Sequence, residues 1–200
     1  MGLSYPRNLQ PSILFSTPLW HYNNNKLPEG VYEWALNYRE THPMKDRKVN
    51  SILYKGRSGV GGYQSPQRPV KEFPYMDHLW SILNPEFDQF KAIGWWLNIN
   101  PKGSYNKTHT HPGCDLAAIW YITDNYGLLN FIDSSMHERY AAYVHVMSKH
   151  NETSAKKINA GEGDLLVFPA DLPHGVEEHQ LDTPRISVSF NMVVDYKEKW

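Results

Sequence analysis

Residues 185–194, with the sequence RISVSFNMVV, alternate between polar and apolar side chains as far as Met192. The polar positions are Arg185, Ser187, Ser189 and Asn191, and the apolar positions are Ile186, Val188, Phe190, Met192 and Val194. Because successive side chains of a β-strand point to opposite faces, such a strand has one polar face and one apolar face. A polar inner face and an apolar outer face are typical of a barrel-like sheet that encloses a wet pocket and has helices packed outside it.

The rest of the sequence after Gly94 agrees with a β fold. Short apolar or alternating runs are separated by turn residues, as in β-sandwiches and small barrels. We predict seven or eight strands, at residues 95–100, 116–122, 128–132, 141–147, 164–168 and 185–194 and around the histidines of residues 106–115.

The sequence before Gly94 is predicted to be mostly helix and loop. Apolar side chains recur at helical spacing over residues 28–42 and again over residues 70–84. The glycine-rich stretch between them, GRSGVGGYQSPQRP, lacks the Gly-Lys-Ser/Thr continuation of a phosphate-binding loop and is predicted to be a surface loop. With 200 residues, 40% of them hydrophobic, the chain can bury one compact core. We therefore predict a single domain over residues 1–200, with a helical and loop support region at 1–93 and a β core carrying the functional site at 94–200.

Charge and termini exclude several classes of partner. The 20 basic and 21 acidic residues leave a formal charge of −1, so no basic field would attract nucleic acid or an anionic membrane. The N-terminus lacks the pattern of a secretion signal, and no apolar run approaches the ~20 residues of a membrane span. We expect a cytoplasmic protein whose partners are small molecules; a homodimer stays open.

Three histidines are candidate metal ligands. In the segment NKTHTHPGCD, His109 and His111 would project from the same face of an extended strand. In GEGDLLVFPADLPHGV, a buried strand and a short loop deliver His174. Neutral imidazole is the commonest metal ligand, and three ligands leave positions open for reactants. The competing interpretation is a chance histidine pair and a histidine that caps a loop.

Arg185 and Ser187 suggest an anion site near this metal. Arginine grips a carboxylate through two charge-assisted hydrogen bonds and stays charged at physiological pH. An arginine that points into the polar interior of a barrel would be costly to bury without an anion. We expect that anion to be a bound ligand.

At this point the chain resembles the Fe(II)- and 2-oxoglutarate-dependent oxygenases. Their double-stranded β-helix fold carries a His-x-Asp/Glu motif, a distal histidine and, about ten residues later, Arg-x-Ser. More specifically, it is similar to a family of oxygenases from marine bacteria and phages with an HxHP motif. The matching segments are ILFSTPLW, GVGGYQSP, WLNINPKGSYNKTHTHPG, GDLLVFPADLPHGV and PRISVSFNM.

The resemblance implies a fold, a cofactor set and roles for residues. The fold would be mainly β with flanking helices around a jelly-roll, cupin-like double-stranded β-helix. The protein would be cytoplasmic and could be phage-encoded. His109, His111 and His174 would bind Fe(II), while Arg185, with Ser187 and Tyr121, would bind the far carboxylate of 2-oxoglutarate. The reaction would release succinate and CO2 and hydroxylate a substrate that the sequence does not identify.

One departure from the superfamily pattern leaves an alternative ligand set. The superfamily has a carboxylate where this chain has His111, and Asp115 offers a carboxylate four residues later, as in the cupin pattern that begins at Gly103. We prefer His111 because HTHP is intact as the family motif and Asp115 begins an apolar strand. Two other functions stay open: a cupin-type metal enzyme that does not use 2-oxoglutarate, and a metal-free jelly-roll module for structure or binding.

Overall fold

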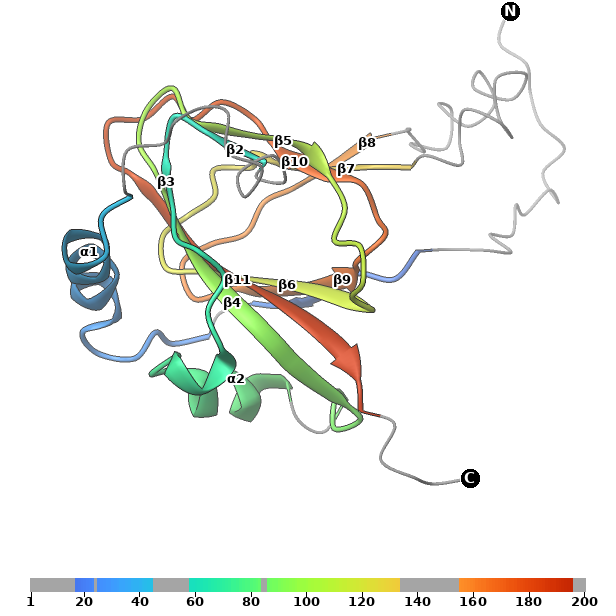
Figure 1. The fold of residues 1–200 in the computed structure, drawn as a ribbon. Helices are drawn as coiled ribbons and strands as arrows, with labels where there is room; N and C mark the ends of the chain where they lie inside the picture. The colour runs from blue at the N-terminus through green and yellow to red at the C-terminus, as the bar shows by residue number, and fades with distance from the viewer. Residues whose placement is uncertain (1–16, 24, 45–57, 84–85, 134–154, 196–200) are drawn as a thin grey trace, which may run out of the picture.

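The computed structural model describes residues 17–23, 25–44, 58–83, 86–133 and 155–195. Within these ranges the chain forms two antiparallel sheets that lie opposite each other (Figure 1). The larger sheet has the order β1 (Trp20–Tyr22), β9 (Leu165–Pro169), β6 (Leu116–Tyr121), β11 (Arg185–Val194), β4 (Phe90–Asn100) and β3 (Tyr63–Gln64). The smaller sheet has the order β2 (Gly59–Val60), β5 (Tyr105–His109), β10 (His174–Val176), β7 (Leu129–Ile132) and β8 (Ala155–Ile158).

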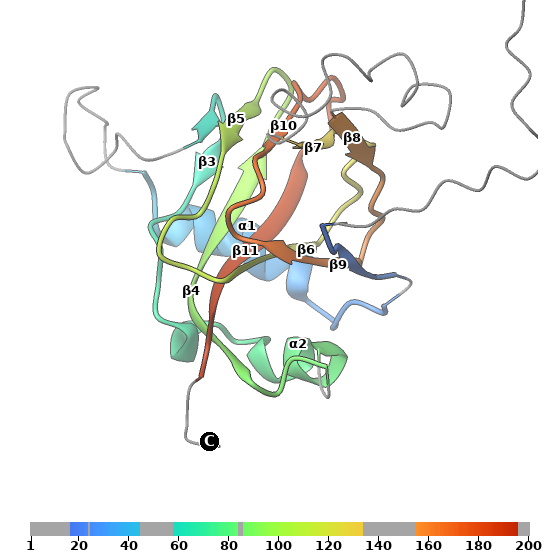
Figure 2. The same cartoon turned by 90° about the vertical axis from the view of Figure 1, so that its right-hand side faces the viewer.

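Two α-helices cover the outer face of the larger sheet, α1 (Val31–Thr41) and α2 (Met76–Leu83), as Figures 1 and 2 show. Ala35 of α1 and Leu79 of α2 are buried in one apolar cluster with Leu97 of β4 and Val188 of β11. The core therefore lies mainly between this sheet and its helices, which leaves the opposite face of the sheet for the smaller sheet. The mainly β class with flanking helices is confirmed.

Strand β11 has the two faces that its sequence predicts. Its apolar residues Ile186, Val188, Phe190 and Met192 are buried on the helix side. Its polar residues Arg185, Ser187 and Ser189 are also buried, but they line a cavity between the sheets. The neighbouring strand β4 repeats this division, because Trp95, Leu97 and Ile99 join the apolar core whereas Trp96, Asn98 and Asn100 line the cavity.

The predicted helix over residues 70–84 is wrong in its first half. The structure has a 3₁₀ turn, η2 (Val70–Glu72), then an extended Phe73 with φ −89° and ψ 113°, and only then α2. Pro74 explains the break, because proline has no N–H to donate and forces the preceding residue out of the helical region. The predicted helix over residues 28–42 is confirmed as α1.

Several strands were not predicted. The glycine-rich stretch predicted to be a loop contributes two short strands, β2 on the smaller sheet and β3 on the larger one. The loop expected before His174 leads into strand β10, and β1 and β8 were missed entirely. The predicted strand over residues 141–147 lies outside the described residues, and the strand predicted to begin at Trp95 begins at Phe90.

Among the helices that the structure describes, none is both long and apolar enough to cross a membrane.

Candidate metal centre

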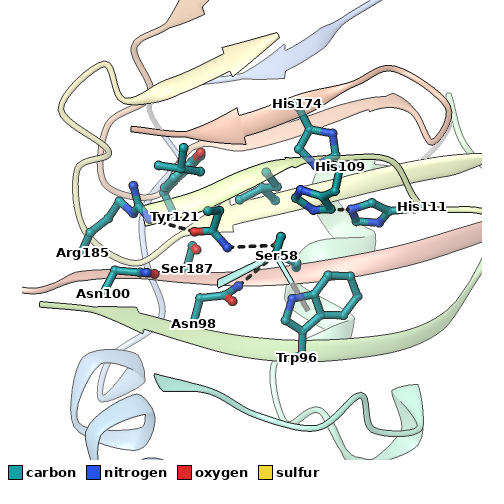
Figure 3. A pocket seen from close by; sticks show the side chains of 14 residues that line it. Ser58, Trp96, Asn98, Asn100, His109, His111, Tyr121, His174, Arg185 and Ser187 are labelled. Carbon is teal, nitrogen blue, oxygen red and sulfur yellow. Dashed lines mark hydrogen bonds between the residues drawn. The ribbon is translucent and has the colours of Figure 1, made fainter. Parts of the chain in front are cut away.

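Three histidines meet between the two sheets (Figure 3). His109 ends β5 and His174 begins β10, and the two are paired across these antiparallel strands. His111 lies two residues beyond the end of β5, where its backbone N–H donates to the carbonyl of Ala170 at 2.8 Å. The candidate ligand nitrogens of the three residues all lie within 4.8 Å of one another. In the described part of the chain, no carboxylate or thiol joins this group.

Hydrogen bonds fix which nitrogen of each ring carries the proton. The Nδ1 atom of His109 lies 2.8 Å from the carbonyl of Lys107, and that of His174 lies 2.9 Å from the carbonyl of Leu172. A carbonyl can only accept, so both Nδ1 atoms must be protonated, and in the neutral ring Nε2 then carries the lone pair. The Nδ1 atom of His111 lies 2.6 Å from Oδ1 of Asn191, which implies the same arrangement.

The three free lone pairs therefore face one another. Nε2 of His111 lies only 3.3 Å from Nε2 of His109. Two lone pairs at this distance repel unless a cation lies between them, and a metal-ligating histidine usually has its other nitrogen held by an acceptor in this way. The donor set thus fits a divalent metal ion.

Burial favours the neutral, metal-binding form of these rings. Desolvation lowers the pKa of His109 and of His111 below the usual value, and it lowers the pKa of His174 to about 3. In each case burial is the largest cause, because a charged imidazolium loses hydration between the sheets. All three rings are therefore neutral at physiological pH, so protons do not compete with a metal.

Arg185 lies in the same cavity, at the end away from the triad (Figure 3). Its side chain is buried, with 3% of the residue exposed. Nη2 donates one long hydrogen bond of 3.5 Å to Oδ1 of Asn106, and Nη1 is buried with no partner among the described residues. Burial lowers the pKa of this guanidinium, but arginine remains charged. An unpaired buried cation with free donors is a site for an anion.

Ser187 and Tyr121 line the cavity near Arg185, as the sequence predicts. They are partners across β11 and β6. Burial raises the pKa of the Tyr121 phenol, which is hydrogen-bonded to Asn125, so its hydroxyl stays protonated and can donate. The structure thus gathers all six predicted site residues in one cavity; their roles stay predictions.

Several residues of this cavity were missed at the level of sequence. The floor is a ladder of partners on β4 and β11, in which Asn100 lies opposite Arg185, Asn98 opposite Ser187 and Trp96 opposite Ser189. The alternation in WWLNIN could have revealed Asn98 and Asn100, since they fall on the face opposite to Trp95, Leu97 and Ile99. Unlike Trp96, the tryptophans Trp95 and Trp120 belong to the apolar core.

Asn106 reaches the cavity through an irregularity in β5. His109 pairs with His174 and Asn106 with Val176, so three steps along β5 match two along β10. An extra residue of this kind is a β-bulge, and it lets residues of odd spacing face the same side. Gly175 lies against the bulge, where an added Cβ would be 3.1 Å from the carbonyl oxygen of Asn106.

Asp115, the alternative ligand, is used elsewhere. Its Oδ2 atom accepts a hydrogen bond of 2.7 Å from the backbone N–H of Val194, and the residue is exposed. It does not join the histidine group. The structure therefore brings together His109, His111 and His174 and not Asp115.

Residues 94–191 match the sequence model of a family described as "Putative 2OG-Fe(II) oxygenase". In this segment, just under half of the chain, the protein is similar to the 2OG-Fe(II) oxygenases. The matched segment contains the three histidines, Arg185 and the cavity floor. Among curated proteins, none is similar enough in sequence to match.

Several solved structures share the fold of this chain. HygX from Streptomyces hygroscopicus, with nickel and 2-oxoglutarate bound, is 12% identical at a TM-score of 0.59 and covers 92% of this chain and 85% of its own. The α-ketoglutarate-dependent epimerase SnoN from nogalamycin biosynthesis is 13% identical at a TM-score of 0.59, and the match covers 89% of this chain and 78% of SnoN. A prolyl hydroxylase from Trichoplax adhaerens, in complex with a hypoxia-inducible-factor peptide, is 15% identical at a TM-score of 0.55. The match covers 88% of this chain and 84% of the hydroxylase. The predicted double-stranded β-helix is thereby confirmed.

Proposed function

We propose that this oxygenase is an Fe(II)- and 2-oxoglutarate-dependent dioxygenase whose iron is bound by His109, His111 and His174. One observation carries the assignment: three neutral imidazoles point their free Nε2 atoms at one another while their Nδ1 atoms are held by acceptors. The nickel- and 2-oxoglutarate-bound HygX structure, which shares the fold, supports this choice of cofactors. When bound, iron and 2-oxoglutarate activate O2, with oxidative decarboxylation to succinate and CO2 and hydroxylation of a C–H bond.

Arg185 is proposed to bind the carboxylate of 2-oxoglutarate that lies farther from the metal. Within the described ranges its Nη1 has no partner and its Nη2 has only a long one, so both can turn to a carboxylate. Ser187 and the Tyr121 hydroxyl lie beside this position and add hydrogen bonds. The dicarboxylate would thus extend over the polar floor of the cavity from Arg185 to the histidines.

His111 makes the proposed site unusual in charge. Three neutral ligands leave Fe(II) with one more positive charge than the usual pair of histidines and a carboxylate. Nitrogen ligands also favour Fe(II), Ni(II) or Zn(II) over Mg(II) and Ca(II), which prefer oxygen. The dianionic co-substrate then contributes all the negative charge around the ion.

The proposal extends to the wider setting of the enzyme. We place it in the HxHP type of marine bacteria and phages, as a cytoplasmic single domain in which residues 1–93 support a catalytic core at 94–200. The substrate is unidentified, and two copies of the chain could form a homodimer.

Succinate formation tests the proposal directly. The purified protein is incubated with Fe(II), ascorbate and 2-oxoglutarate, and succinate is measured by liquid chromatography with mass spectrometry. We expect slow uncoupled turnover that is lost in His174→Ala. A protein that holds one iron per chain and forms no succinate, with or without candidate substrates, would contradict the proposal. Oxidation of a substrate at the same rate without 2-oxoglutarate would favour a cupin-type enzyme, and a failure to bind any metal would favour a binding module.

A further inference from the structure

His111 differs from the other two histidines in how its ring is held. His109 and His174 each donate from Nδ1 to a backbone carbonyl two residues earlier in the chain. His111 instead donates to a side chain, Oδ1 of Asn191, at 2.6 Å. Because no substitution removes a backbone carbonyl, only the orientation of His111 depends on the chemical identity of another residue.

The position of Asn191 explains why it can reach this ring. It is the last polar residue on the inner face of β11, three positions along that face from Arg185. Its partners on the neighbouring strands are Gly94 and Ala117, and glycine and alanine are the two smallest amino-acid types. Asn191 therefore has only small residues beside it on the two neighbouring strands, while the side chain of Gln67 lies against Gly94.

The orientation of this amide decides whether His111 can bind a metal. With Oδ1 toward the ring, Nδ1 of His111 carries the proton and Nε2 is free. With the amide nitrogen toward the ring, Nδ1 would have to accept, the proton would move to Nε2, and the ligand position would be blocked. An acceptor at this position therefore favours the tautomer that binds a metal, and the neutral amide supplies one.

From this geometry we infer that Asn191 is a positioning residue of the metal centre, which holds His111 in the Nδ1–H form and turns its Nε2 toward the ion. Its carbonyl dipole also places partial negative charge behind the one ligand that replaces a carboxylate. This inference rests on the proposed metal site and adds a residue outside the predicted set. Such outer partners of a ligating histidine contribute roughly 10- to 100-fold to metal affinity.

Two substitutions separate the acceptor from the bulk of the side chain. Asn191→Leu keeps the approximate volume and removes the acceptor, whereas Asn191→Asp keeps an acceptor and adds charge. Asn37→Leu is the matched control, because Asn37 is exposed on α1, on the far side of the larger sheet. Each variant is titrated with Co(II) without 2-oxoglutarate, and the visible absorption of the bound ion reports affinity and coordination.

The expected pattern has three parts. Asn191→Leu weakens Co(II) binding about 10- to 100-fold, Asn191→Asp binds at least as tightly as the wild type, and Asn37→Leu is unchanged. In the metal-free protein, ¹⁵N NMR of labelled histidines shows His111 as Nδ1–H in the wild type and a mixture of tautomers in Asn191→Leu. Thermal unfolding shows whether each variant is folded.

Equal Co(II) affinity of the wild type and a folded Asn191→Leu would overturn the inference, as would a wild-type His111 protonated at Nε2. Weak Co(II) binding by Asn191→Asp as well as by Asn191→Leu would also overturn the inference. It would show that Asn191 acts through its packing and not through its acceptor oxygen. If the wild type itself bound no Co(II), the proposed metal site would fail instead, so the two failures are distinguishable.

Discussion

Replacing Arg185 with methionine should improve the stability of the ligand-free protein and abolish its use of 2-oxoglutarate. The wild-type guanidinium is buried; among the residues that the structure describes, its Nη1 has no partner and its one hydrogen bond is 3.5 Å long. Removal of a buried charge that lacks a good partner stabilises a fold by about 1–4 kcal/mol in comparable cases. For a domain of this size, each kcal/mol corresponds to roughly 2–4 °C in Tm.

The same substitution would remove the two charge-assisted hydrogen bonds that we propose Arg185 donates to the co-substrate. Each such bond contributes about 1.5–3 kcal/mol, so the loss is at least about 3 kcal/mol. At about 1.4 kcal/mol per factor of ten, the Kd for 2-oxoglutarate rises by at least about 100-fold. Metal binding should be unchanged, because Arg185 does not contact the histidines.

Thermal unfolding with increasing 2-oxoglutarate measures both effects in one experiment. The metal-loaded wild type should gain Tm with 2-oxoglutarate, whereas Arg185→Met should start higher and gain almost nothing. Arg68→Met is the control, because Arg68 is partly exposed and already paired with Glu72 at 2.7 Å. The reasoning is refuted if Arg185→Met loses its metal, or if it responds to 2-oxoglutarate as the wild type does.

Three further predictions concern the ligand set, the bulge and pH. Asp115→Asn should bind metal as the wild type does, while His111→Ala should bind it far more weakly; a Co(II) titration in which Asp115→Asn loses the metal would restore the cupin assignment. Gly175→Ala should destabilise the protein by about 1–3 kcal/mol, because the new Cβ would meet the Asn106 carbonyl oxygen at 3.1 Å. Urea unfolding measures this change in stability. An unchanged midpoint would show that the bulge can shift to accommodate the Cβ without loss of stability. The pKa of His174 is lowered to about 3 in the folded chain. As the pH falls, His174 is therefore protonated below about pH 6.5 in the unfolded chain but only near pH 3 in the folded chain. The metal-free protein should therefore lose stability as the pH falls through this window, and a urea midpoint equal at pH 7.5 and pH 5 would contradict the burial of this ring.

Regular alternation made the larger sheet predictable from sequence. The faces of β11 followed from its period of two, and they placed Arg185 and Ser187 inside the cavity correctly. The same rule would have placed Asn98 and Asn100 there. The break in the helix predicted over residues 70–84 could also have been predicted from Pro74. Proline has no N–H to donate and forces the residue before it out of the helical region.

Features that depend on pairing between distant segments could not be read locally. Strands of two or three residues, such as β2 and β10, are too short to show any period. The inward position of Asn106 results from a bulge against β10, and nothing near Asn106 in the sequence encodes that register. The partnership of His111 with Asn191 spans 80 positions of the chain.

The histidines do not all belong to the same sheet. His109 and His174 are part of the smaller sheet, whereas His111 is anchored to the larger one through Asn191 and lies beside Trp96. A bound ion would therefore cross-link two layers that otherwise meet through side-chain packing and side-chain hydrogen bonds such as that from Arg185 to Asn106. Hydrogen exchange should then slow on metal binding in β5 and β10, which carry His109 and His174, and change little in the central strands β6 and β11 of the larger sheet. In this protein the catalytic ion would also serve as a structural tie between the sheets.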